Sequence, residues 1–96
     1  MKPSTALENN REAIRRIVAA NRCTNPRVFG SVLHGTDRED SDLDLLVDPL
    51  PGASYFDLGG IEYELEQLLG IRIDVLTPNS ISRFFRDRVV SEAKPV

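Results

Sequence analysis

Residues 42–48 and 71–76 alternate apolar and polar side chains over most of their length. A period of two is typical of a β-strand that buries one of its faces, so each segment predicts a half-buried strand. The first segment places Asp42 and Asp44 together on its polar face, and the second segment places Asp74 there. A chain with this pattern has to cover the apolar face of a small sheet and leave open a face that carries carboxylates.

Helical periodicity surrounds these two strands. In residues 5–21, 54–69 and 79–92 apolar side chains recur every three to four positions, which predicts three amphipathic helices. A further short strand is expected at 27–29, followed by a short helix at 31–34. The predicted order is therefore α-β-α-β-α-β-α, which is a mixed α/β (α+β) domain. Its helices would cover one face of a three-stranded mixed sheet.

Local signals add detail to this expectation. Asn25-Pro26 is expected to interrupt the chain before the short strand. Gly70 is expected to end the second long helix, which Gly59-Gly60 would weaken by roughly 2 kcal/mol relative to two alanines. Phe84 and Phe85 of the last helix could lie in the core or at an interface, and of the two the core is expected.

The size and charge of the chain limit what it can do alone. Its 96 residues are expected to form one small domain, 1–96, so a large substrate has to be held partly by another chain. The net charge of −3 excludes a general positive field that recruits nucleic acid, and no direct nucleic-acid contact is expected. Cys23 is the only cysteine, and no apolar run approaches transmembrane length. We therefore expect a cytoplasmic protein without membrane contact.

Aspartate is depleted in strands, so three on one predicted face call for an explanation. Asp42 and Asp44 project in parallel and repel each other by on the order of 4 kcal/mol at ~4 Å and an effective dielectric of about 20. A divalent cation removes this repulsion, and carboxylates favour Mg²⁺ when phosphate oxygens complete its coordination. A solvated strand face would accommodate the same residues, and the three aspartates alone do not decide between the two hypotheses.

The pair Gly30-Ser31 lies between the predicted strand at 27–29 and the predicted helix at 31–34. Glycine lets backbone N–H groups approach a phosphate, and the Ser31 hydroxyl could cap the helix and donate to a phosphate oxygen. Taken alone, such a pair is more commonly an ordinary turn with a capping serine. Together with a divalent-metal site, however, a phosphate cradle indicates a metal–nucleotide substrate.

Two similar motifs are excluded by the residues at their key positions. Gly30 and Gly35 have the spacing of a P-loop, but Thr36 occupies the position of its lysine. An EF-hand loop that starts at Asp40 would have Leu45 in place of its glycine and Pro51 in place of its last glutamate.

The stretch Val28-Phe29-Gly30-Ser31, ten further residues and Asp42-Leu43-Asp44 together resemble the signature of the nucleotidyltransferase superfamily with the DNA polymerase beta fold. The strand at 73–76 and the ending at 86–93 look like the minimal branch of that family. This branch includes the MntA-type antitoxins, which act with HEPN-domain toxins of the HepT type. The resemblance extends from about Leu7 to Val96 and implies the polymerase beta-like nucleotidyltransferase fold.

The resemblance assigns a role to each candidate residue. Gly30 and Ser31 would hold the triphosphate of the substrate, ATP. Asp42 and Asp44 would ligate two Mg²⁺ ions, and Asp74 would complete the second metal site and help to deprotonate the acceptor hydroxyl. The acceptor oxygen would attack the α-phosphorus in line, with pyrophosphate as the leaving group.

The activity that the resemblance implies is that of a protein adenylyltransferase. AMP would pass from ATP to a tyrosine hydroxyl of a HEPN-type toxin, and the chain would be the antitoxin of a type VII-like toxin–antitoxin pair that forms a hetero-oligomer. Two alternatives remain. One is an antitoxin that neutralises its toxin by binding alone, against which the mutually repelling aspartates argue. The other is a nucleotidyltransferase that acts on a small molecule or an RNA end.

One position departs from the pattern of the family. Many relatives carry an arginine where this chain has His34, directly before Gly35. A histidine would present a positive charge to phosphate only in part near neutral pH. His34 is equally well explained as a surface residue, so its contact with phosphate stays open.

Overall fold

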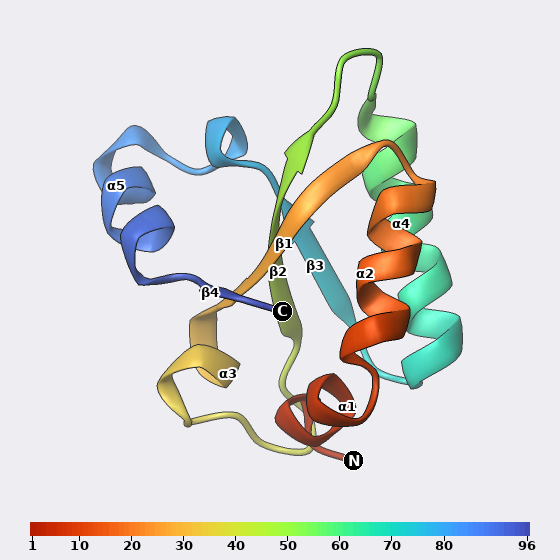
Figure 1. The fold of residues 1–96 in the computed structure, drawn as a ribbon. Helices are drawn as coiled ribbons and strands as arrows, with labels where there is room; N and C mark the ends of the chain where they lie inside the picture. Colours follow the sequence, from red (N-terminus) through yellow and green to blue (C-terminus); the bar gives the residue numbers. More distant parts are fainter.

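The sheet has four strands in the order β3-β2-β1-β4 (Figure 1). The strands are β1 (Cys23–Phe29), β2 (Leu43–Pro49), β3 (Ile73–Leu76) and β4 (Lys94–Pro95). β1 is antiparallel to both of its neighbours, whereas β2 and β3 are parallel. The computed structural model describes all 96 residues and confirms the predicted mixed α/β architecture. It has one strand more than the three that were expected.

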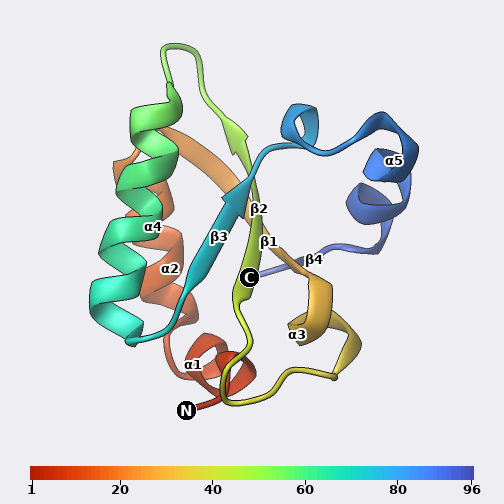
Figure 2. The ribbon, with the colours of Figure 1, turned by 180° about the vertical axis from the view of Figure 1, so that it is seen from behind.

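Five α-helices and one 3-10 turn complete the fold. They are α1 (Pro3–Asn9), α2 (Arg11–Ala20), α3 (Gly30–His34), α4 (Tyr55–Leu69), the 3-10 turn η1 (Pro78–Ser80) and α5 (Arg83–Glu92). The long helices α2 and α4 lie side by side against one face of the sheet. α3 and α5 lie on the opposite side (Figure 2), so the prediction that the helices cover one face only is wrong for these two. None of the helices has both the length and the apolar character that a membrane span requires.

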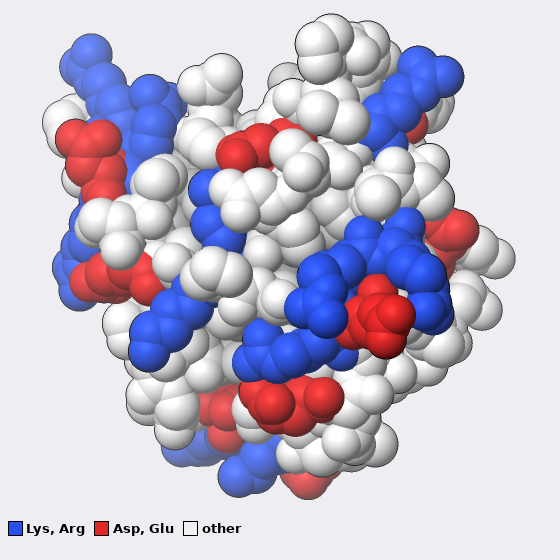
Figure 3. Space-filling model, viewed as in Figure 1, with Lys and Arg blue, Asp and Glu red and all other residues white.

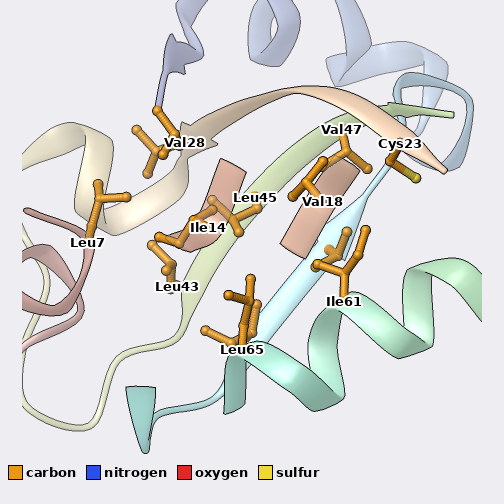
Figure 4. Close-up of a cluster of buried hydrophobic side chains, with 13 residues drawn as sticks. Leu7, Ile14, Val18, Cys23, Val28, Leu43, Leu45, Val47, Ile61 and Leu65 are labelled. Atoms are coloured by element: carbon orange, nitrogen blue, oxygen red, sulfur yellow. The ribbon is translucent and has the colours of Figure 1, made fainter. Parts of the chain in front are cut away.

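The core lies between the sheet and the layer formed by α2 and α4 (Figure 4). Leu43, Leu45 and Val47 of β2 are fully buried in it, which confirms the predicted alternation of this strand. The two helices contribute Ile14, Val18, Ile61 and Leu65. Burial of one such side chain contributes about 1.5–3 kcal/mol, so β2 is firmly anchored and its other side chains are held at fixed positions on the opposite face.

The first predicted helix is divided into α1 and α2 at Asn10, which has a non-helical φ of −138°. The Asn10 side chain donates a hydrogen bond to the carbonyl oxygen of Ala6 at 2.9 Å. Asparagine commonly bonds to nearby backbone in this way and then competes with a continuous helix.

β1 is longer than the predicted strand and includes Asn25-Pro26. The expected interruption at this pair is a bulge inside the strand, because the pairing with β2 shifts register between Thr24 and Arg27. Asn25 takes a left-handed φ of 54° there. A bulge leaves a residue outside the hydrogen-bonded ladder, and it can therefore accommodate the proline.

α4 confirms the predicted helix boundaries. Ser54 caps its first turn through a hydrogen bond from the backbone N–H of Phe56, and Gly70 ends it with a left-handed φ of 69°. The helix runs without interruption through Gly59 and Gly60. A Cβ at Gly60 would lie 2.5 Å from Oδ1 of Asn21, so the glycine allows α4 to pack closely against the end of α2.

α5 differs from the expectation, because the side chains of Phe84 and Phe85 are 81% and 59% exposed instead of lying in the core. The helix begins later than predicted, with Ser82 as its cap, and it has no buried residue. Arg86 holds it in place by donating hydrogen bonds to the carbonyl oxygens of Pro78 and Ile81. α5 is thus attached to η1 by polar contacts, and most of the surface of its two phenylalanine side chains is exposed.

β4 is the strand that was not expected. It has two residues, one of them Pro95, and a proline weakens a sequence signal for a strand. After it, Val96 buries its side chain in the core, and its carbonyl oxygen accepts a hydrogen bond from Nη1 of Arg15 at 2.6 Å. The end of the segment is therefore held against β1 and α2.

Candidate active site

Gly30 lies where β1 ends and α3 begins, directly against the side chain of Asp44. Its φ is 72°, and a Cβ at this position would overlap Oδ2 of Asp44. The register explains the approach, because Phe29 is paired with Asp44 across β1 and β2. Glycine is thus required at this position for two reasons: the backbone is left-handed, and the neighbouring carboxylate leaves no space for a Cβ.

Ser31 is the second residue of α3 and is half-buried. Its side chain does not cap the helix, because the cap position is Phe29 and no side-chain hydrogen bond is made there. The predicted capping role is therefore wrong. The structure does place Ser31 beside Gly30 on the carboxylate side of the sheet.

Asp44 and Asp74 are direct neighbours across the parallel pair of β2 and β3. Both point away from the α2–α4 core, because the residues on either side of each in sequence are buried. Burial, followed by the charges of Asp74 and Asp42, raises the pKa of Asp44 from its ordinary value of 3.8 to about 6. The charges of Asp74 and Asp42 therefore add to the effect of burial at Asp44, which is the larger cause.

Asp42 precedes the first residue of β2 instead of lying within the strand. Nε of Arg72 lies 2.9 Å from its Oδ1 in an ion pair, yet this buried oxygen receives no well-aligned hydrogen bond. No three acidic, histidine or cysteine side chains gather closely enough to form a ready-made metal centre. The predicted site residues thus share one face of the sheet, but Asp42 is engaged by an arginine.

A hollow of about 230 Å³ lies beside Gly30, between α3 and α5. Its apolar lining comes from Phe29, Leu33, Phe85 and Val89, and its polar lining from His34, Arg88 and Glu92. Nε2 of His34 lies 3.5 Å from Oε2 of Glu92, whose Oε1 contacts Nε of Arg88 at 3.3 Å. The imidazole of His34 therefore lies next to the carboxylate of Glu92 at the hollow.

Sequence reasoning missed two features of this region. One is the role of Arg72, for which the available signal was its place two residues before Asp74 in the alternating segment 71–76. The other is the meeting of His34 with Glu92. That contact joins residues 58 positions apart, and no periodicity encodes it.

Three arginines, Arg11, Arg15 and Arg16, lie on α2, which covers the face of the sheet opposite to the carboxylates. Figure 3 shows basic side chains gathered over α2 and near β4, with acidic side chains among them. Arg11 pairs with Glu8, and Arg16 pairs with Glu12. The basic area is thus largely compensated by neighbouring carboxylates.

The fold and the carboxylate face define a minimal nucleotidyltransferase. The chain belongs to the nucleotidyltransferase domain family, which matches residues 11–96. A candidate protein adenylyltransferase of Methanocaldococcus jannaschii is 45% identical over 69 residues, which are 72% of this chain and 74% of that protein. The protein adenylyltransferase MntA of Thermococcus cleftensis is 38% identical over 65 residues, which are 68% of this chain and 66% of that protein.

Solved structures agree with this assignment. A candidate minimal nucleotidyltransferase superposes with a TM-score of 0.87 and 40% identity, over 100% of this chain and 97% of that one. A toxin–antitoxin crystallised with AMP-PNP superposes with a TM-score of 0.75 and 23% identity, over 90% of this chain and 71% of that one. At that identity the second match shows the fold alone.

Proposed function

We propose that this chain is a Mg²⁺-dependent protein adenylyltransferase that transfers AMP from ATP to a tyrosine hydroxyl of a HEPN-type toxin. It would thereby be the antitoxin of a type VII-like pair and assemble with its toxin. The observation that carries the proposal is the backbone of Gly30 against Asp44, which is itself paired in register with Asp74. On this proposal, the arrangement would bring a phosphate cradle and two metal-binding side chains together.

The names of similar proteins support the finer parts of the proposal. The two relatives described above are named as protein adenylyltransferases, one of them MntA. One structural neighbour is a toxin–antitoxin with AMP-PNP, an analogue of ATP. The aligned regions cover about two thirds to three quarters of these proteins, so their substrates and partners enter here as part of the proposal.

The residues of the carboxylate face suit Mg²⁺. Asp44 is partly buried beside Asp74 with a raised pKa, so a divalent cation would relieve a charge that the fold itself leaves uncompensated. Asp42 has a buried oxygen without an aligned donor. We expect Asp42, Asp44 and Asp74 to hold two ions, and Mg²⁺ would supply charge stabilisation at the entering and leaving oxygens.

The side chains and backbone of the site have distinct tasks in this proposal. Gly30 and Ser31 hold the triphosphate, since the absence of a Cβ at Gly30 leaves the backbone accessible. Asp74 accepts the proton of the acceptor hydroxyl, because its side chain is exposed on the outer strand β3. The acceptor oxygen then bonds to the α-phosphorus, the bond from that phosphorus to the bridging oxygen breaks, and pyrophosphate leaves with the electron pair.

The acceptor has to come from outside the domain. The hollow beside Gly30 is the cavity nearest to the cradle, and it is small and open. No second domain covers the carboxylate face of these 96 residues. A partner protein that presents a tyrosine fits this geometry, whereas a small-molecule acceptor would lack a surrounding pocket.

Substitution of single carboxylates tests the proposal. Asp44→Asn and Asp74→Asn should each lower transfer of AMP to the toxin by on the order of 10²-fold or more, because a metal ligand is lost. Asp48→Asn is the matched control on the same strand. Asp48 pairs with Arg27 at 2.8 Å and serves the structure. The proposal fails if the Asp44→Asn and Asp74→Asn variants transfer AMP as well as the Asp48→Asn control.

The same variants distinguish neutralisation of the toxin by AMP transfer from neutralisation by binding alone. If the Asp44→Asn variant still suppresses the ribonuclease activity of the toxin at a one-to-one ratio, occlusion and not transfer silences the toxin. The proposal predicts that this variant fails to suppress the toxin even when the two are associated.

A further inference from the structure

Arg72 contacts Asp42 across the strands that carry the candidate metal ligands. β2 and β3 are in register at Leu43 and Ile73, so the residues before them, Asp42 and Arg72, are neighbours as well. Nε of Arg72 lies 2.9 Å from Oδ1 of Asp42. The carboxylate face thus holds one attractive cross-strand pair next to the repulsive pair of Asp44 and Asp74.

This ion pair is loosely held on the arginine side. The side chain of Arg72 is 77% exposed, and its guanidinium makes no other hydrogen bond or ion pair. Exposed pairs of this kind are weak and are easily exchanged for a stronger partner. Oδ1 of Asp42, in contrast, is buried and lacks an aligned donor, so its lone pairs are only partly satisfied.

The three aspartates do not form a ready-made metal centre, and one of them is already paired with Arg72. Asp42 is the aspartate that lies outside the strand, and it is the one engaged by a cation. The singly charged guanidinium of Arg72 is therefore paired with the carboxylate of Asp42, which a divalent ion would need as a ligand.

We propose that the guanidinium of Arg72 neutralises Asp42 in the metal-free protein and that a divalent metal ion displaces the guanidinium when it binds. Because the metal ion has to compete with Arg72 for Asp42, Arg72 sets the metal concentration at which the site assembles. The inference rests on the proposed function, because it assumes that Asp42 is a metal ligand. It assigns Arg72 a positioning role, since the residue acts through Asp42 and has no part in the reaction itself.

The test is direct titration of the metal-free protein with Mn²⁺, with the free ion followed by electron paramagnetic resonance. Arg72→Gln should lower the Kd for Mn²⁺ by about two- to fivefold, the range that corresponds to removal of one competing exposed ion pair. Arg16→Gln is the matched control, because Arg16 is 70% exposed, carries the same charge and pairs with Glu12 on α2. Its Kd should equal that of the wild type at 0.15 M salt.

An unchanged or higher Kd for the Arg72→Gln variant overturns the inference and leaves the proposed function intact. Failure of the wild type to bind Mn²⁺ even with AMP-PNP present contradicts the proposed function itself. A second readout uses the wild type and does not depend on a folded variant. The Nε–H resonance of Arg72 should exchange with water faster once Mg²⁺ is added, and a resonance that Mg²⁺ leaves unchanged also overturns the inference.

Discussion

The backbone of Gly30, the first residue of α3, lies against the carboxylate of Asp44 in β2, although the rest of α3 and the loop after it separate the two residues along the chain. The contact joins the two halves of the family signature into one site. It also makes the glycine irreplaceable for a reason that goes beyond its left-handed φ of 72°.

Substitution of Gly30 by alanine tests the two reasons for a glycine, which are the left-handed φ and the contact with Asp44. Gly30→Ala should cost about 1–2 kcal/mol of stability for the left-handed backbone, and it should also displace Asp44 and abolish nucleotidyl transfer. Gly35→Ala is the matched control, since Gly35 has a φ of 71° and nothing within 4 Å of its Cβ position. Thermal unfolding and a transfer assay on both proteins check this. Equal activity of the two variants would contradict the role of the Gly30–Asp44 contact.

The raised pKa of Asp44 predicts that its ionised carboxylate lowers the free energy of unfolding. The folded state keeps the proton of Asp44 up to about pH 6, whereas the unfolded chain releases it near 3.8. The free energy of unfolding therefore falls as the pH rises from about 4 to about 6, and the loss is complete above that range. Without metal, Asp44→Asn should be more stable than the wild type by about 1–2 kcal/mol at pH 7, after allowance for solvent screening.

Urea denaturation in the presence of EDTA measures this difference at pH 4 and at pH 7. The two proteins should be nearly equal at pH 4, where the Asp44 carboxyl of the folded wild type is protonated and therefore neutral, like the amide that replaces it. A variant that is less stable than the wild type at pH 7 would show that the carboxylate supports the fold. Together with the loss of transfer, a gain in stability would identify a functional residue kept at a cost to the fold.

The exposed aromatic side chains of α5 should contribute little to stability. Phe84→Ser is expected to change the free energy of unfolding by no more than about 0.5 kcal/mol, because the ring is 81% exposed. Ile61→Ala, in the core, should cost about 2–5 kcal/mol. Thermal unfolding of both variants measures the contrast, and comparable losses would mean that α5 packs more tightly than the structure shows.

The sequence predicted the elements with strong local signals. The alternation of β2 placed Leu43, Leu45 and Val47 in the core, and Ser54 and Gly70 bound α4 as expected. These features depend on neighbours in the chain. For the same reason, the alternation of apolar and polar residues alone predicted that Asp44 and Asp74 lie on the polar faces of their strands.

What the sequence did not predict depends on contacts between distant segments. β4 is too short and too rich in proline to be recognised, and it exists because Val96 and Arg15 hold it in place. Phe84 and Phe85 have core-like spacing, but α5 meets η1 through Arg86 and leaves the rings outside. The metal site was likewise expected to be assembled, whereas Arg72 engages one of its members.

Transfer from labelled ATP tests the central claim most directly. The protein is incubated with Mg²⁺ and the proposed HEPN-type toxin, and ATP carries the label either at the α-phosphate or at the γ-phosphate. Nucleotidyl transfer predicts that the α-label becomes attached to a tyrosine of the toxin and that the γ-label leaves as pyrophosphate, in a reaction that Asp44→Asn abolishes. Absence of the α-label from the toxin, or transfer of the γ-label to it, would contradict the account.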